Sequence, residues 1–333
     1  MTSSATSTVD NVLRLGALAG PDALPLLIEP AGAGCDPREV FDAIDHCVRT
    51  HLDRLGAILF RGFDFSGDDA LHAFVASFGD PLLDYEFGST PRSALGKGVY
   101  TSTEYPAHQS IPLHNEQSYA RRWPMRIWFQ CRLPAAEGGE TPIADSRAIH
   151  RLIDPRIRRR FSEKGLMYVR NSGNGLDVPW QQVFGTADRA AVEAYCRANG
   201  IACEWKKDGE LRTRQVCQAT AVHPRTGDEV WFNQAHLFHV SALDAALRET
   251  LLDLVEPDDL PRNVYYGDGS PIEEVVLDEI RAVLDSRTIV FPWQQDDVLM
   301  LDNMLVAHAR APFRGPRKVV VAMARDHGAQ GPS

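Results

Sequence analysis

The tetrapeptide Leu113-His114-Asn115-Glu116 places two potential metal ligands one residue apart. In an extended segment alternate side chains project to the same side, so His114 and Glu116 can reach one ion. A third ligand must come from elsewhere, and His308, shortly after the apolar stretch Asp297-Val-Leu-Met-Leu301, is the best candidate. Two imidazoles and one carboxylate leave open coordination positions, which is typical of non-haem iron(II) sites that bind O2.

A second pair of histidines competes with this assignment. His236 and His239 are spaced three residues apart, as on one helical turn, but no adjacent carboxylate completes a ligand set. We therefore expect His236 to line the same pocket or to satisfy a buried hydrogen bond. His108 is expected in a loop near the entrance of that pocket. A His-x-Glu triplet alone is a weak indication, because long proteins contain such triplets by chance.

The composition excludes several classes of protein. The chain has 333 residues, 44% of them hydrophobic, which is enough for a large core. A formal net charge of −10 disfavours nucleic-acid binding. We expect no membrane span, because no run of about 18 apolar residues occurs. The first ten residues do not resemble a signal peptide, and the six cysteines show no CxxC spacing, so we expect reduced thiols and a cytoplasmic location.

Hydrophobic periodicity predicts a mixed α+β, mainly β, fold with one barrel-like core and helices outside. Apolar stretches bounded by turn residues predict strands, and amphipathic spacing predicts helices. We expect a flexible tail over 1–12, a single domain over 13–325 and a second tail over 326–333. The predicted helices are Pro37 to Leu55, Asp68 to Phe78, Ser146 to Ile153, Ala187 to Asn199 and Ile272 to Ser286. The predicted strands are Gly56 to Gly62, Arg126 to Arg132, Thr141 to Ala144, Leu166 to Arg170, Gln215 to His223, Glu229 to Phe232, Asp297 to Leu301 and Lys318 to Met323.

Several motifs surround the three candidate ligands in a fixed order. They are Thr101-Ser-Thr-Glu-Tyr-Pro106, Leu113-His-Asn-Glu-Gln-Ser-Tyr119, Gly138-Gly-Glu-Thr-Pro142 with Asp145, Trp231-Phe-Asn-Gln234, Asp302-Asn303, His308-Ala-Arg-Ala-Pro-Phe313 and Gly315-Pro-Arg317. Together they resemble the TauD/TfdA superfamily of dioxygenases, and most of all its branch of SyrP-like and clavaminate synthase-like enzymes of natural-product pathways. The resemblance runs from about Gly56 to Met323, most of the chain.

This resemblance implies a double-stranded β-helix (jelly-roll) core and an enzyme that uses iron(II), 2-oxoglutarate and O2. His114, Glu116 and His308 would hold the metal. Related halogenases lack the carboxylate ligand, so Glu116 argues against halogenation and favours hydroxylation. Desaturation or oxidative cyclisation at the same iron is the alternative, and a non-catalytic jelly-roll binding protein is a third. The branch suggests an amino-acid-like substrate, free or bound to a peptidyl carrier protein, with no nucleic acid or membrane involved.

The far carboxylate of 2-oxoglutarate needs a cation, and a guanidinium offers a planar, bidentate match. Family matching gives this role to Arg317, helped by Thr141, with Arg310 and Arg314 as competitors. The alternative without a function is that these three arginines belong to a solvent-exposed basic turn. Arg92 and Arg170 are candidates to pair with an acidic substrate group, or are surface arginines. The candidate substrate-binding residues, each equally interpretable as satisfying nearby backbone groups, are Thr101, Ser102, Thr103, Asn233 and Gln234.

Overall fold

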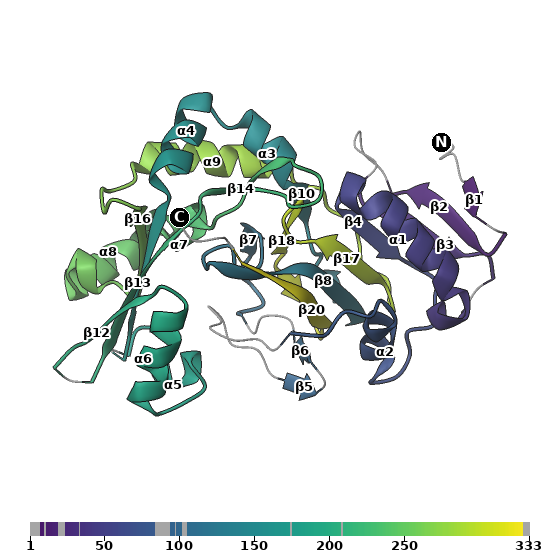
Figure 1. The fold of residues 1–333 in the computed structure, drawn as a ribbon, viewed down its shortest axis with the longest axis horizontal. Coiled ribbons are helices and arrows are strands. Elements are labelled where there is room, and N and C mark those ends of the chain that lie inside the picture. The colour runs from purple at the N-terminus through teal and green to yellow at the C-terminus, as the bar shows by residue number, and fades with distance from the viewer. Residues whose placement is uncertain are drawn as a thin grey trace.

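The computed structural model describes residues 7–9, 11–18, 24–32, 34–83, 94–96, 98–101, 105–173, 175–207 and 209–328. The predictions for Arg92, Ser102 and Thr103 lie outside these residues. Figure 1 shows two layers of strands at the centre of the molecule, with helices on the outside and a further sheet at one end.

A nine-stranded sheet forms the larger layer. Its long central strands, β8 and β20, pair antiparallel along their lengths, and among the strand pairs that the structure describes in this sheet only β3 and β4 run parallel. Strand β17 and residues 319–324 of β20 are buried on both faces, which explains their nearly unbroken apolar sequences, whereas the buried part of β8 also contains Arg126 and Gln130. The strand order is β1 (Ser7–Val9), β2 (Leu13–Ala17), β3 (Leu26–Pro30), β4 (Ala57–Phe60), β17 (Val298–Asp302), β8 (Arg122–Leu133), β20 (Lys318–Gly328), β6 (Val99–Thr101) and β5 (Ala94–Gly96).

A three-stranded sheet faces the larger one. It consists of β10 (Ile143–Asp145), β18 (Val306–Arg310) and β7 (Ile111–His114). Ile127, Leu299 and Val321 of the large sheet share one hydrophobic cluster with Val306 of β18, so apolar side chains fill the space between the layers. These two facing sheets form the expected jelly-roll core, and the position of β18 against β7 determines the geometry of the site (Figure 1).

Helices and smaller sheets cover this core. On the large sheet, η1 (Pro37–Val40), α1 (Phe41–Leu55) and α2 (Ala70–Ser77) bury their apolar faces. Over the small sheet, Ile149 of α3 and Leu277 and Ile280 of α9 join a cluster with Ala307 of β18. The remaining elements are α3 (Ser146–Leu152), α4 (Pro155–Lys164), α5 (Trp180–Val183), α6 (Arg189–Ala198), α7 (Ala235–Phe238), α8 (Ala245–Leu254), α9 (Glu274–Ser286), the sheet β12 (Ala202–Trp205), β13 (Leu211–Cys217), β11 (Leu166–Ser172) and β16 (Arg262–Tyr266), the pairs β14 (Thr220–Val222) with β15 (Glu229–Trp231) and β9 (Glu137–Gly138) with β19 (Phe313–Arg314), and the 3-10 turns η2 (Val240–Ala242) and η3 (Pro257–Asp259).

The mixed fold class is confirmed, although helices and strands take roughly equal shares instead of a mainly β composition. The predicted strand Gln215 to His223 is interrupted, since β13 ends at Cys217 and β14 begins at Thr220. Strand β1 lies within the predicted N-terminal tail and β20 continues to Gly328, whereas the single-domain assignment over 13–325 stays a prediction. The six cysteines, all within the described residues, form no disulfide bonds. None of the described helices combines the length and the apolar character that crossing a membrane requires.

Gly56 ends α1, and its backbone lies close to Val306 at the start of β18. Its φ is +83°, and a Cβ there would lie 2.6 Å from Cγ2 of Val306. We expect Gly56→Ala to lower the free energy of unfolding by about 2 kcal/mol or more, because a left-handed backbone alone costs an L-residue 1–2 kcal/mol. Urea denaturation measures this loss.

Gly34→Ala is the matched control, since Gly34 has φ +70° but no atom within 4 Å of the new Cβ. This variant should show the backbone cost only. An equal loss in both variants would mean that the close approach to Val306 costs nothing.

Candidate metal centre and cosubstrate site

His114, Glu116 and His308 meet where β7 and β18 lie side by side. Among the residues that the structure describes, they are the one group of three His, Cys, Asp or Glu side chains placed to share an ion, with ligand atoms all within 4.8 Å of one another. The β7–β18 register pairs His308 directly with His114, and Nε2 of His308 lies 3.9 Å from Oε2 of Glu116. Glu116 and His308 are buried, and His114 is half-buried.

The path of the chain differs from the extended segment assumed for the His-x-Glu motif. Strand β7 ends at His114, and Glu116 lies in the turn that follows. Gln117, in the same turn, adopts a left-handed φ of +56°. Glu116 therefore reaches the histidines from a turn, and other elements must hold the backbone of that turn.

The donor set fits a divalent iron. Nδ1 of His114 lies 2.8 Å from the carbonyl oxygen of Pro112. Because a carbonyl oxygen only accepts hydrogen bonds, Nδ1 carries the proton and Nε2 keeps its lone pair for a metal. Two imidazoles and one carboxylate, two of them from β7 and the turn that follows it and one from β18, would bind an ion and leave its other positions open.

The rival histidines do not form a second centre. Nε2 of His236 is 2.8 Å from the carbonyl oxygen of Leu113, and burial lowers the pKa of this imidazole to about 4, so it is neutral at pH 7 and donates that hydrogen bond. His236 thus satisfies a buried hydrogen bond, one of its two expected roles. His239 turns to Ser241, with Nδ1 2.8 Å from Oγ.

Arg317 lies against the loop that carries Thr141. Its Nε donates to the carbonyl oxygen of Gly139 at 2.8 Å. A Cβ on Gly139 would stand 2.9 Å from Cδ of Arg317, so only glycine allows this approach. Burial, and after it the charge of Arg310, lowers the pKa of Arg317 to about 10. A carboxylate placed beside this guanidinium would offset both effects.

The two competing arginines have other contacts. Arg310 is buried and donates to the carbonyl oxygens of Tyr105, Pro106 and Gln109 at 2.7 or 2.8 Å, so it holds the segment that leads into β7. Arg314 is 84% exposed and lies 3.5 Å from the carboxylate of Glu137. Thr141 is buried and accepts a hydrogen bond from Nε1 of Trp293 at 3.2 Å.

The predicted substrate residues bond mainly to backbone groups. Nδ2 of Asn233 donates to the carbonyl oxygen of Ala219 at 2.7 Å, and Nε2 of Gln234 donates to that of Asn115 at 2.9 Å. These bonds match the backbone-satisfying alternative for both amides. Thr101 is half-buried in β6, where it is paired with Val320 of β20. Contact of Asn233, Gln234 and Thr101 with the substrate stays a prediction.

Arg170 is not a surface arginine. It is 4% exposed and lies 4.0 Å from the carboxylate of Asp177, which also binds Arg262 at 2.7 Å. Arg170 belongs to β11 and Arg262 to β16, so this cluster lies on the outer sheet. Its pairing with an acidic substrate group stays a prediction.

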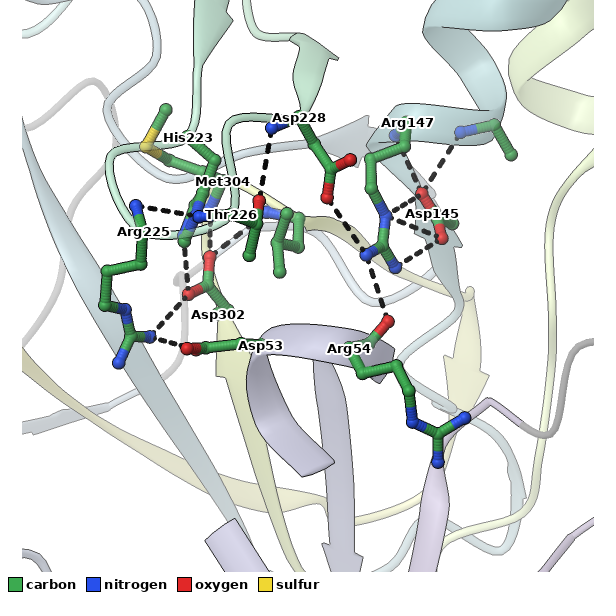
Figure 2. A network of polar contacts seen from close by, with 12 residues as sticks. Asp53, Arg54, Asp145, Arg147, His223, Arg225, Thr226, Asp228, Asp302 and Met304 are labelled. Atoms are coloured by element: carbon green, nitrogen blue, oxygen red, sulfur yellow. Dashed lines mark hydrogen bonds and ion pairs between the residues drawn. The ribbon is translucent and has the colours of Figure 1, made fainter. Parts of the chain in front are cut away.

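Asp302-Asn303 is one of the motifs that resemble the family, and the sequence alone assigns it no role. Nδ2 of Asn303 donates to the carbonyl oxygen of Glu116, and Asp302 lies 3.1 Å from Nε2 of His223. Figure 2 shows that Asp302 also faces Arg225, which binds Asp53 of α1. No local pattern could reveal such contacts, because the partners are far apart in the chain.

Comparisons with known proteins agree with this geometry. The family model described as taurine catabolism dioxygenase TauD, TfdA family, matches residues 23–323. The dapdiamide synthesis protein DdaC of Enterobacter agglomerans is 44% identical over 278 residues, 84% of each chain. A clavaminate synthase-like protein of Arabidopsis thaliana is 31% identical over 290 residues, again 84% of each chain.

Among solved structures, PvcB of Pseudomonas aeruginosa, described as an Fe, alpha-ketoglutarate dependent oxygenase from an isonitrile synthetic pathway, has a similar fold. The TM-score is 0.55 at 17% identity, covering 96% of this chain and 93% of PvcB. The similarity in fold and the sequence matches confirm both the predicted jelly-roll class and the predicted superfamily branch. The chain belongs to the TauD/TfdA family of dioxygenases.

Proposed function

We propose that this dioxygenase hydroxylates an unactivated C–H bond of an amino acid or an amino-acid-derived intermediate. Iron(II), 2-oxoglutarate and O2 are the cofactor and cosubstrates that its family membership implies. The substrate gains one oxygen atom, while 2-oxoglutarate takes the other and leaves as succinate and CO2. The observation that carries the proposal is the meeting of His114, Glu116 and His308 at the β7–β18 pair.

Each residue at the site has a definite task on this proposal. The two imidazoles and the Glu116 carboxylate hold the iron, which supplies the redox chemistry when bound. Arg317 pairs with the far carboxylate of 2-oxoglutarate, and Thr141 lies in the neighbouring loop. Carboxylate pairing by a partly buried guanidinium orients the cosubstrate toward the metal. Phe129 of β8, with its ring centroid 4.9 Å from that of His308, closes one side of the site with apolar surface.

The substrate class rests on the relatives. The relative at 44% identity is a dapdiamide synthesis protein, and the other is clavaminate synthase-like. Both names agree with the natural-product branch that the motifs resemble, whose substrates are amino acids, free or attached to a peptidyl carrier protein. Desaturation or oxidative cyclisation is the second candidate, because it shares the first hydrogen abstraction. A single domain over 13–325 and a cytoplasmic location complete the proposal; the free thiols support the location.

We expect succinate to form only when 2-oxoglutarate, iron(II), O2 and a suitable amino-acid substrate are present together. Free and carrier-loaded amino acids would be screened for substrate-dependent succinate, with products analysed by mass spectrometry. A product heavier by one oxygen atom supports hydroxylation, and one lighter by two hydrogen atoms supports desaturation or cyclisation. The control is heat-inactivated enzyme. An enzyme that binds the amino acids but forms no succinate with any of them would instead support the non-catalytic binding protein.

A further inference from the structure

Asn303 holds the backbone of Glu116 at two points. Its Oδ1 accepts from the backbone N–H of Glu116 at 2.8 Å, and its Nδ2 donates to the carbonyl oxygen of the same residue at 2.9 Å. The second Nδ2 proton goes to the carbonyl oxygen of Pro124 at 2.8 Å. Asn303 is fully buried, so both amide protons and the amide oxygen are used inside the protein.

The turn that carries Glu116 also donates a hydrogen bond back to Asn303. Nδ2 of Asn115 donates to the backbone carbonyl oxygen of Asn303 at 2.6 Å, and to Oγ of Ser146 at 3.1 Å. The turn after β7 and the turn after β17 are therefore joined by reciprocal side-chain bonds, all of them buried. Since Glu116 lies outside any strand, these bonds replace the ladder that would otherwise fix its backbone.

Asp302 fixes the turn from which Asn303 projects. Its Oδ1 accepts from the backbone N–H groups of Met304 and Leu305 at 3.0 and 3.2 Å. Its Oδ2 faces Nε2 of His223 at 3.1 Å, with both side chains fully buried (Figure 2). Backbone N–H of Thr226 donates to Nδ1 of His223 at 3.1 Å, so the ring proton is on Nε2 and points at Asp302.

This turn connects two ligands of the candidate iron site. Val306, three residues after Asn303, begins β18, and β18 carries His308. The position of the Asn303 side chain therefore sets where Glu116 lies relative to His308. A displacement of about 1 Å matters at such a site, because metal ligands must reach bond distance together.

We propose that Asn303 is a positioning residue that holds Glu116 in its metal-binding place before iron arrives. The proposal rests on the proposed function, since it takes Glu116 as an iron ligand. It adds a residue that touches neither metal nor cosubstrate and acts only through the backbone of that ligand.

Asn303→Asp tests the proposal without changing the size of the side chain. The aspartate keeps an acceptor for the Glu116 N–H but loses both donated bonds and faces two carbonyl oxygens. We expect the Kd for Mn(II), measured by paramagnetic resonance titration, to rise about 10–100-fold, the usual cost of losing an outer contact of a metal ligand. The visible spectrum of bound Co(II) should change as well, because the carboxylate ligand moves.

Asn171→Asp is the matched control. Asn171 is also buried, accepts one bond from Arg212 and donates two to the carbonyl oxygens of Asp258 and Leu260, but it lies in β11 of the outer sheet. This variant should keep the wild-type Mn(II) Kd within about twofold. An unchanged Kd and Co(II) spectrum in folded Asn303→Asp would overturn the proposal, as would an equal loss of affinity in both variants.

Hydrogen exchange on the wild-type protein needs no variant and covers the case in which Asn303→Asp does not fold. We expect the Glu116 amide to be protected equally with and without Mn(II), because Asn303 already binds it. Fast exchange that slows only when the metal binds would show that the metal organises the turn, and would overturn the proposal. Failure of the wild type to bind any divalent metal would instead refute the proposed function.

Discussion

His308→Ala should abolish tight iron binding and substrate-dependent succinate formation while leaving the fold intact. His308 is one of the three proposed protein ligands and lies in β18, the strand paired with β7. Removing a ligand should weaken Mn(II) or Fe(II) binding by more than the roughly 10–100-fold that an outer contact is worth. Calorimetric titration with Mn(II) measures the affinity, and the thermal midpoint of the metal-free variant shows whether the fold has survived.

His239→Ala is the control for this experiment. His239 belongs to the rival pair and bonds to Ser241, so its loss should leave the metal affinity unchanged. If metal binding were lost in His239→Ala and kept in His308→Ala, the metal site would have to be assigned to His236 and His239 instead.

Arg317→Ala should raise the concentration of 2-oxoglutarate needed for half-maximal turnover by about 100-fold, since hydrogen bonds to charged groups contribute 1.5–3 kcal/mol and 1.4 kcal/mol is tenfold. The guanidinium lies against Gly139, beside the loop of Thr141. Arg317→Lys should recover only part of this loss, because an ammonium cannot make the planar bidentate pair. The initial rate of succinate formation against 2-oxoglutarate concentration gives the comparison.

The other two arginines provide contrasting controls. Arg314→Ala should behave as wild type, since its side chain is 84% exposed. Arg310→Ala should lower the thermal midpoint, because three carbonyl oxygens lose their donor. A large rise in the 2-oxoglutarate requirement in Arg310→Ala, with Arg317→Ala normal, would reassign the cosubstrate to Arg310.

Local patterns predict the helices and strands that bury many apolar side chains of their own, because this burial leaves a periodic pattern in the sequence. Helix α1 buries Ile44, Cys47, Val48 and Leu52 at helical spacing, so its periodicity is visible in the sequence. Strand β17 and the first part of β20 are apolar enough to be recognised without a partner, and β8 contains the short apolar run Ile127-Trp-Phe129. No apolar pattern predicts helix α8, because it has no buried residue to produce a periodic signal.

The site was predictable only in part. The identity of the three candidate ligands came from motifs in a fixed order, and the structure brings all three together. What holds them depends on contacts between distant segments, such as the bond from Glu116 to Asn303 over 187 positions. The different surroundings of Arg310 and Arg317 likewise depend on which loops pack against them, and spacing along the chain carries no such information.

Anaerobic titration of the wild-type protein with iron(II) and then 2-oxoglutarate tests the iron site most directly. Chelation of the iron by the keto acid produces a weak visible charge-transfer band, and O2 is absent, so the band reports binding without turnover. We predict this band for the wild type and its loss in His308→Ala. No band in the wild-type protein, or a band of equal intensity in His308→Ala, would contradict an iron site made by His114, Glu116 and His308.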